Sequence, residues 1–266
     1  KIAVDDLGVL ILDNPAIVVT QSVITQCQKF NVAILFCDER HLPLSITLPL
    51  WSGHSLHTRV LREQMSSKVS RRKRLWQQII KIKITEQAAT VERAGLQSEK
   101  LWRLAEKVKS GDPENIEAQA AREYWRKLMG NNFCRDVASG GVNNVLNYGY
   151  SIMRAMVARA LVGTGLHPAI GLHHKNQYNG LCLADDVMEP FRPWIDSIVR
   201  DMDISTNETI ITRDIKQQIL GLLSEQVYYG NEKMPLMNSV HYLAAQLKHA
   251  LTDNKVSLTY PQRHLM

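Results

Sequence analysis

The sequence predicts an α+β protein in which a small β-rich domain, residues 1–54, precedes a larger all-helical domain, residues 55–266. Up to about residue 50 the apolar residues form short runs rich in Val and Ile, which are typical of strands. After Trp51 they recur every three or four residues over long segments, which is typical of helices. Hydrophobic residues make up 45% of the 266 and charged residues 22%, so the composition indicates a folded core and excludes a disordered chain.

The N-terminal domain is expected to contain several strands and one helix. Its apolar runs are IAV, VLIL, IVV, VAILF and LPLSITLPL, and Asp13-Asn14-Pro15 is a turn sequence between two of them. Thr20 is a suitable N-cap for a short helix over residues 21–30. The chain begins at Lys1 with strand-like sequence, and we expect the natural protein to have further strands before it.

The second domain contains several helix boundaries. Asp112-Pro113-Glu114 combines a capping Asp, a Pro at the first helical position and an acid in the first turn, so a helix is expected to begin there. It should end at Met129, before Gly130. Further helices are expected over residues 142–162, 181–189, 194–202, 208–228 and 238–251, with an irregular tail over residues 253–266.

The cysteines and the apolar runs indicate a cytoplasmic protein. Cys27, Cys37, Cys134 and Cys182 include no CxxC pair, so we expect reduced and mostly buried thiols rather than a zinc module. No apolar run approaches the roughly 18 residues that a membrane span needs. Two Asp stand within the first eight residues, where a signal peptide would be apolar.

Positive charge is concentrated in one segment. The whole chain has a net charge of +6, but residues 59–83 contain nine basic residues and a single acid, Glu63, so the rest of the chain is slightly negative. The nine are Arg59, Arg62, Lys68, Arg71, Arg72, Lys73, Arg74, Lys81 and Lys83. This density predicts a surface that faces the phosphates of DNA or RNA, or else a solvated basic helix face.

Missing motifs exclude several common enzyme classes. The sequence has no GxxxxGK[ST], no GxGxxG after a strand, no HExxH, no His-Asp pair and no GxSxG. Chemistry that uses a nucleoside triphosphate or a serine nucleophile elbow is therefore not expected.

Residues 165–193, GLHPAIGLHHKNQYNGLCLADDVMEPFRP, contain groups that can hold a cation. Asp186 and Glu189 are three residues apart, so on a helix they share a face and can point at a single ion. His174 precedes them in a segment whose Gly and Asn residues allow it to turn toward the same point, and only one of His173 and His174 is expected to face inward. The alternative is a hydrogen-bonded surface histidine beside a solvated helix end.

A second candidate is Glu117, in the sequence IEAQAAREYW. Its alanine neighbours allow another helix or a ligand to approach closely, and Arg122 and Tyr124 suit phosphate contact or base stacking. The alternative is an ordinary carboxylate on an exposed helix.

Four motifs in order resemble one family. They are EAQAAREY around Glu117, VNNVLNYGY over residues 142–150, GLHPAIGLHH over residues 165–174 and DVMEPFRP over residues 186–193. Together they resemble the CRISPR-associated adaptation integrases (Cas-one), which insert new spacers into the repeat array. HHKNQYN followed by ADDVMEPFRP is most similar to the type II variant. The resemblance implies a β domain joined to a larger helical domain.

The resemblance also implies a metal site and a reaction. Its ligands would be Glu117, His174 and Glu189, with Asp186 in a supporting catalytic role, although many relatives have Asp where Glu189 stands. Two carboxylates and one imidazole favour magnesium or manganese over a closed zinc site. Such an ion can activate a DNA 3′-hydroxyl and stabilise charge on the attacked phosphate, so the implied reaction is transesterification at the borders of a CRISPR repeat.

The implied partners are double-stranded DNA, a second copy of the chain, a small ferredoxin-like protein (Cas-two) and other adaptation and effector proteins. The residues predicted to contact DNA are Arg59, Arg62, Arg71, Arg72, Lys73, Arg74, Arg122, Tyr148 and Arg192, with Arg135 and Tyr124 as further candidates. Arg192 could instead form a structural ion pair with Asp185, Asp186 or Asp196. Two other functions remain open at this point, a non-catalytic nucleic-acid-binding helical protein and a general metal-dependent nuclease.

Overall fold

The N-terminal part of the protein is a small sheet covered by one helix. The computed structural model describes residues 2–49, 56–202, 204, 210–253 and 255–263. The first elements are η1 (Val4–Asp6), β1 (Val9–Leu12), α1 (Gln21–Lys29), β2 (Ala33–Cys37) and β3 (Pro43–Thr47). The sheet has the order β1-β2-β3, with β1 parallel and β3 antiparallel to β2. The helix α1 connects the two parallel strands, and the side chain of Thr20 caps it as expected.

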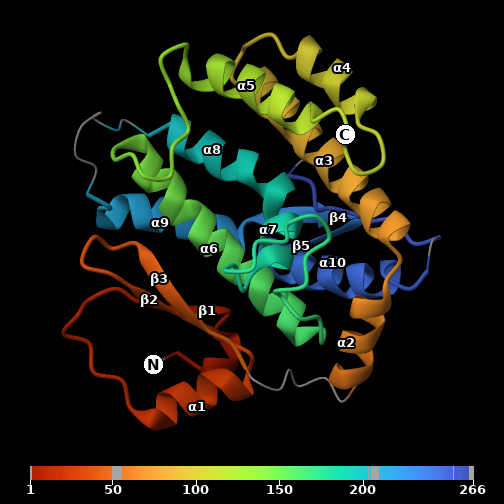
Figure 1. Cartoon of the computed structure of the whole chain (residues 1–266). Helices are drawn as coiled ribbons and strands as arrows, with labels where there is room; N and C mark the ends of the chain where they lie inside the picture. The colour runs from red at the N-terminus through yellow and green to blue at the C-terminus, as the bar shows by residue number, and fades with distance from the viewer. Residues whose placement is uncertain (1, 50–55, 203, 205–209, 254, 264–266) are drawn as a thin grey trace.

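The central strand β2 is buried on both of its faces. Ile34 packs with Cys27 of α1, whereas Leu35 belongs to the main core of the protein. Successive side chains of a strand point to opposite faces, so β2 is covered by α1 on one side and by the helical part on the other (Figure 1). Burial on both faces explains why this segment is continuously apolar rather than alternating.

Two long helices, α3 and α6, organise the rest of the protein, and α7 lies between them (Figure 1). The elements in order are α2 (His57–Ser66), α3 (Val69–Arg93), α4 (Glu99–Lys107), α5 (Ile116–Met129), α6 (Val142–Gly163), α7 (Cys182–Met188), η2 (Glu189–Phe191), α8 (Arg192–Arg200), α9 (Arg213–Gly221), η3 (Leu222–Ser224), β4 (Gln226–Tyr229), β5 (Glu232–Pro235) and α10 (Leu236–Ala250). The helix α3 contacts α5, α7 and η2, and α6 contacts α7, α8, α10 and the sheet. The predicted α+β class is therefore confirmed.

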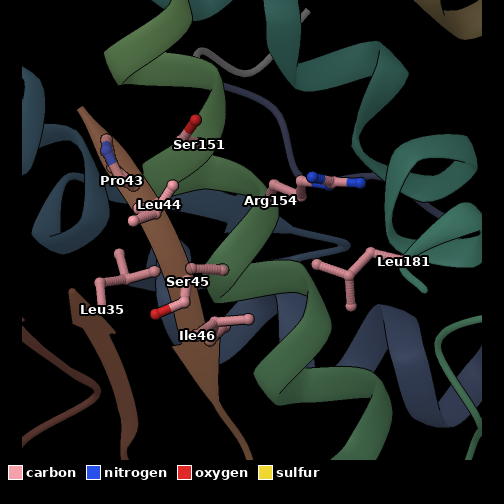
Figure 2. A pocket seen from close by; sticks show the side chains of 9 residues that line it. Leu35, Pro43, Leu44, Ser45, Ile46, Ser151, Arg154 and Leu181 are labelled. Atoms are coloured by element: carbon pink, nitrogen blue, oxygen red, sulfur yellow. The ribbon is translucent and has the colours of Figure 1, made fainter. Parts of the chain in front are cut away.

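A small cavity remains where the sheet meets α6. It has a volume of about 120 Å³ and lies between β3 and α6, with Leu35 and Ile46 on one side and Arg154 on the other (Figure 2). Leu181, from the loop before α7, also lines it. The cavity adjoins a wider groove, because the two share Pro43, Leu44 and Arg154 as lining residues. His174 also lines this groove, so the groove extends from the sheet to the loop that contains His174.

Some predicted elements are wrong in detail. The run IAV precedes the sheet and enters η1, and the run IVV, residues 17–19, has no regular structure. Ile17 and Val18 are exposed, so their β-branched side chains gain nothing from a strand that has no partner. The helix expected at Asp112 begins at Ile116, because Asp112 and Asn115 adopt left-handed backbone conformations. The Asp112 carboxylate nevertheless accepts hydrogen bonds from the first helical N–H groups.

The helix predicted over residues 208–228 is also wrong. Within the described residues, α9 ends at Gly221 and is followed by the hairpin β4–β5, which turns at Gly230 with a positive φ of 61°. A Gly-Asn turn between two short runs is a hairpin sequence, and the helical interpretation overlooked it. The described part of the tail is irregular except for a bridge between Tyr228 and Gln262. The domain boundary predicted at residue 54 lies outside the described residues.

The burial of the cysteines differs in part from the expectation. All four cysteines are free, but only Cys27 and Cys182 are buried, and Cys134 is exposed, against expectation. In the part of the chain that the structure describes, every helix is too short or too polar to cross a membrane.

Candidate active site

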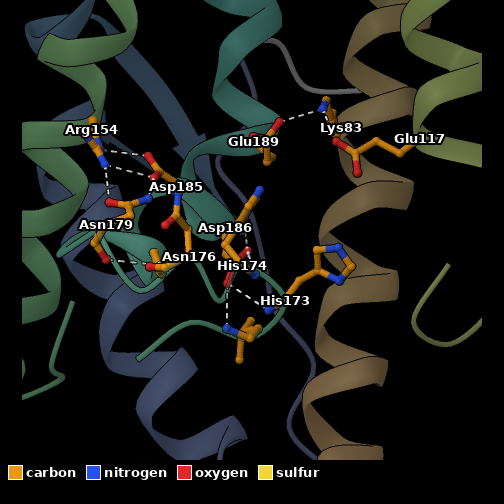
Figure 3. A network of polar contacts seen from close by, with 12 residues as sticks. Lys83, Glu117, Arg154, His173, His174, Asn176, Asn179, Asp185, Asp186 and Glu189 are labelled. Atoms are coloured by element: carbon orange, nitrogen blue, oxygen red, sulfur yellow. Dashed lines mark hydrogen bonds and ion pairs between the residues drawn. The ribbon is translucent and has the colours of Figure 1, made fainter. Parts of the chain in front are cut away.

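Two carboxylates from distant segments meet at one ammonium group. Lys83 Nζ lies 2.6 Å from Glu117 Oε1 and 2.6 Å from Glu189 Oε2 (Figure 3). The three residues come from α3, from the first turn of α5 and from the start of η2. Lys83 is buried because it occupies the apolar stripe of α3, one turn after Ile79 and next to Ile84. The fold thus brings Glu117 and Glu189 together around a single positive charge.

Glu189 is ionised despite its burial. Burial alone raises the pKa of this carboxyl, but the charges of Arg192 and Lys83 outweigh that effect and lower the pKa to about 2. Arg192 Nε donates to Glu189 Oε1 at 2.9 Å. Arg192 therefore forms its ion pair with Glu189, and not with the aspartates that the sequence suggested.

His174 is held by Asp186. The two Asp186 oxygens accept hydrogen bonds from the backbone N–H groups of Leu172, His173 and His174, and Oδ1 lies 2.6 Å from His174 Nδ1. Asp186 and Glu189 are both buried, so they do not form the solvated helix end that was the alternative. The hydrogen bond to Asp186 raises the pKa of His174, and it outweighs the effect of burial, which lowers that pKa. When Nδ1–H donates to a carboxylate, Nε2 of a neutral imidazole is left with its lone pair for another ligand.

The loop that contains His174 is fixed from several directions. Gln64 of α2 donates to the carbonyl oxygens of His167 and Ile170 and accepts from His167 N–H. The ring of His173 stacks on Trp76 at 4.3 Å between centroids. As predicted, the two histidines diverge, with His173 exposed and His174 half-buried.

The far end of this loop is fixed by a second polar network (Figure 3). Arg154 of α6 forms an ion pair with Asp185 at 2.8 Å and donates to Asn179 Oδ1 at 2.6 Å, and Asn179 donates to Asp185 at 2.6 Å. Bracing at both ends positions His174 before any ligand binds, which is what a preorganised site requires.

Gly171 is required at the start of this loop because a side chain does not fit. A Cβ there would lie 2.4 Å from the backbone oxygen of His174 and 2.9 Å from Asp186 Oδ2. We expect Gly171→Ala to reduce the free energy of unfolding by roughly 1–3 kcal/mol, as overpacking does, and to displace His174. Gly180→Ala is the matched control, because a Cβ at Gly180 meets no atom within 4 Å. Chemical denaturation of both variants measures this effect, and equal stabilities would contradict it.

A buried carboxyl lies behind the site. Asp196 accepts hydrogen bonds from the phenols of Tyr124 and Tyr150, and Arg192 stacks over the Tyr150 ring at 4.6 Å. Burial raises the pKa of Asp196 to about 7, an effect that the two phenols and Arg192 oppose. Tyr124 is therefore a core residue that positions Asp196 and not a surface for a DNA end.

This shift predicts a pH dependence of stability. Between about pH 4 and pH 7 folded Asp196 retains a proton that the unfolded chain releases, so its contribution is greatest below pH 4 and is lost as the pH rises through 7. We expect the wild-type free energy of unfolding to fall across this window more steeply than that of Asp196→Asn. Urea denaturation at several pH values measures both slopes, and identical slopes would exclude the shift.

The described residues contain no ready-made metal cluster. In the ranges given above, no three His, Cys, Asp or Glu side chains form a group that could hold a metal ion as they stand. Glu117 and Glu189 converge on Lys83 instead, and His174 is bound to Asp186. His174 and Glu189 are nevertheless close enough for the charge of each to shift the pKa of the other. Glu117 and Glu189 thus meet at Lys83, His174 lies close to Glu189, and Asp186 holds His174.

Comparison with known proteins identifies the family. A family model described as CRISPR associated protein Cas1 matches residues 1–219. The CRISPR-associated endonuclease Cas1 of Neisseria meningitidis serogroup C (strain 8013) is 32% identical over 265 residues, which are 98% of this chain and 86% of that relative. The chain belongs to the Cas1 family. The resemblance found in the four sequence motifs is therefore confirmed.

Solved structures of other proteins share the fold. A casposase bound to an integration product matches with a TM-score of 0.77 and 21% identity, over 95% of this chain and 80% of that one. A chain of a Cas6-RT-Cas1–Cas2 complex matches with a TM-score of 0.72 and 17% identity, over 97% of this chain and 32% of that one. At these identities the similarity shows the fold alone.

The basic segment of this Cas1 chain divides into three parts. Arg59 and Arg62 are exposed on α2, where Arg59 also pairs with Glu63. Arg72 and Lys73, together with His173 and Lys175, line a hollow of about 300 Å³ beside the His174 loop. Of the remaining basic residues, Lys68, Arg74 and Lys81 are exposed. Arg71 donates a hydrogen bond to the carbonyl oxygen of Leu251, and Lys83 is buried. The inclusion of Lys83 in a phosphate-facing surface was therefore wrong.

The residues predicted outside this segment differ in position. Arg122 is exposed on α5, five residues after Glu117. Tyr148 is completely buried and close enough to Cys37 and Asp13 for them to affect its pKa, so it faces the sheet and cannot position a DNA end. Arg135 lies near the site and stacks over Tyr150 at 5.2 Å.

Sequence reasoning missed two features. One is the central position of Lys83, which a charged residue on the apolar stripe of α3 could have indicated. The other is a groove of about 530 Å³ between β3 and the helical part, which Arg40, Arg135, Arg154, Arg192 and His174 all line. Its arginines come from separate elements and form no motif in the sequence.

Proposed function

We propose that this Cas1 chain is a metal-dependent DNA integrase that joins a DNA 3′-hydroxyl to a phosphodiester at the border of a CRISPR repeat. The observation that most supports this proposal is that Glu117 and Glu189 meet at the ammonium group of Lys83. His174 and Arg192 lie beside them. Carboxylates at a buried cation, next to a groove lined by arginines, suit phosphodiester chemistry.

The residues present fit magnesium or manganese. Glu117 and Glu189 each place an oxygen 2.6 Å from the same ammonium nitrogen, and Glu189 Oε2 is a buried atom with no hydrogen-bond donor in suitable geometry among the described residues. The Asp186 bond to Nδ1 leaves His174 Nε2 as a third donor. Glu117, His174 and Glu189 would hold the ion, which when bound would lower the pKa of a hydroxyl and stabilise negative charge on phosphate.

The reaction exchanges one phosphodiester for another. The 3′-oxygen forms a bond to the repeat phosphorus, the bond from phosphorus to the repeat's own 3′-oxygen breaks, and the released oxygen takes up a proton. No nucleoside triphosphate is consumed, which agrees with the absence of a phosphate-binding loop from the sequence. The guanidinium of Arg192, which Glu189 and Tyr150 hold, would pair with a phosphate oxygen. Asp186 keeps His174 in one orientation throughout.

Two positively charged surfaces would hold the DNA. The groove that leads to His174 from the side of the sheet is lined by four arginines and two aspartates, so its net charge is positive. The hollow with Arg72 and Lys73 approaches the same loop from the side of α3. Phosphates spaced along two strands would neutralise these surfaces, with affinity that falls as salt rises.

Cas2, a second copy of this chain and double-stranded DNA are the partners that this function requires. The Cas6-RT-Cas1–Cas2 complex and the casposase bound to an integration product share the fold of this chain, and their names support Cas2 and DNA as partners. Two copies bridged by a small ferredoxin-like Cas2 would present two sites to the opposite strands of one repeat.

The test is joining of a short 3′-hydroxyl duplex to a supercoiled plasmid that bears the repeat, with Mg²⁺ or Mn²⁺ and with or without Cas2. Joined product that requires metal and a 3′-hydroxyl is the expected result. Cleavage without joining, with Cas2 present, would indicate a general metal-dependent nuclease. Duplex binding without any reaction would indicate a non-catalytic DNA-binding protein.

A further inference from the structure

The ammonium group of Lys83 occupies the place of a cation between the two carboxylates. It lies 2.6 Å from an oxygen of each, and its stem is fixed at the base because Ile79, Ile80 and Ile84 anchor this part of α3 in the core. Glu189 is buried and Glu117 is partly exposed, and two carboxylates this close together repel each other unless a positive charge separates them. Lys83 provides that charge when no metal is present.

A divalent cation and the ammonium cannot share this position. Both would lie within about 3 Å of the same oxygens, where like charges in a buried site repel strongly. The Lys83 side chain has a flexible stem of four carbons, so rotation about its bonds can move the ammonium while the backbone of α3 stays in place. The question is whether the structure offers it another acceptor.

The structure contains such an acceptor one turn along α3. Gln87 follows Lys83 by four residues, so the two side chains lie on the same face of the helix. Gln87 Oε1 is buried and, among the described residues, has no hydrogen-bond donor. Lys83, Glu189 and Gln87 all line one cavity of about 150 Å³, which gives the ammonium room to turn from the carboxylates to Gln87. A buried acceptor left without a donor costs free energy, which such a contact would recover.

We propose that Lys83 is an exchangeable internal counter-ion: it holds Glu117 and Glu189 together without metal and moves to Gln87 when a divalent cation binds. This inference rests on the proposed function, because it takes the two carboxylates as metal ligands. Lys83 is then a positioning residue that lowers metal affinity while keeping the empty site folded. Gln87 stabilises the metal-bound arrangement and therefore raises metal affinity.

The experiment is a titration of the full chain with Mn²⁺, in which electron paramagnetic resonance measures free Mn²⁺. If Lys83 leaves the site open in about a tenth of the molecules or fewer, Lys83→Met should bind Mn²⁺ at least about tenfold more tightly than wild type. Gln87→Leu should bind more weakly than wild type. The double variant should match Lys83→Met, because Gln87 has nothing to accept once the ammonium is gone. Lys81→Met, on the exposed face of the same helix, is the control and should match wild type.

Thermal unfolding provides the second readout. Without metal Lys83→Met should melt below wild type, and Mn²⁺ should raise its melting temperature by more than it raises that of wild type. If Lys83→Met does not fold, Lys83→Gln serves in both measurements, because its amide can still donate to one carboxylate.

The outcomes separate this inference from the proposed function. Wild type that binds Mn²⁺ while Lys83→Met binds no more tightly would overturn the counter-ion role alone. The counter-ion role would also be overturned if Gln87→Leu weakened Mn²⁺ binding equally in wild type and in Lys83→Met. Absence of Mn²⁺ binding by every variant would overturn both, and tight Mn²⁺ binding by a wild type that never joins DNA would overturn only the integrase reaction.

Discussion

Glu117→Ala is expected to reduce the rate of DNA joining by about 10³-fold or more, because it removes one of the two carboxylates at the candidate metal position. A metal ion supplies several kcal/mol of charge stabilisation to a phosphoryl transition state, and that contribution depends on its ligands. His174→Ala should have an effect of the same order, since it removes the imidazole that Asp186 orients. The measurement is single-turnover joining at saturating DNA and metal.

The matched control for this prediction is Glu114→Ala. Glu114 is an exposed carboxylate three residues before Glu117, and it pairs with Lys109 away from the site. Its loss should leave joining within about twofold of wild type, since a surface ion pair contributes little. A Glu117→Ala protein that joins DNA at the wild-type rate would rule out the proposed metal site.

Asp186→Ala is expected to lower the free energy of unfolding by about 3–5 kcal/mol, as the removal of one partner from a buried charged network does. The carboxylate accepts from three consecutive backbone N–H groups and from the His174 ring, and it is completely buried. Removing it leaves those donors without a partner in the interior, where each costs about 1–3 kcal/mol.

The measurement is the melting temperature, which falls by roughly 2–4 °C for each kcal/mol in a protein of this size. Asp201→Ala is the control, because Asp201 is exposed at the end of α8. Asp186→Asn should be intermediate in stability and should weaken Mn²⁺ binding about 10–100-fold, as changes to groups that orient metal ligands do. An Asp186→Ala protein as stable as wild type would show that the loop is held by other contacts.

The sequence predicts the fold well where periodicity is strong and less well where tertiary contacts decide. The buried stripe of α6 and the cap of α1 at Thr20 follow from local patterns, and both are observed. The hairpin β4–β5 was missed because its strands have only four residues each, too few for a clear alternation against a helical background. The exposed run at residues 17–19 has strand-forming residues but no partner strand, which no local pattern can reveal.

The motifs named the candidate residues but not their contacts. They selected Glu117, His174 and Glu189, of which the structure brings the two glutamates together at Lys83 and His174 close to Glu189. The motifs could not show that Asp186 binds the backbone of the His174 loop, because that contact depends on how residues 171–174 fold back over α7. Lys83 looked like one more basic surface residue, and only the packing of α3 shows that it faces inward.

The central claim is that Glu117, Glu189 and His174 hold one divalent cation in the place that Lys83 now occupies. The most direct measurement is anomalous diffraction from crystals of the protein soaked in Mn²⁺. The account predicts a single strong peak bounded by the two carboxylates and His174 Nε2, with the Lys83 ammonium displaced toward Gln87. A peak elsewhere, or no peak with Lys83 still bridging Glu117 and Glu189, would contradict it.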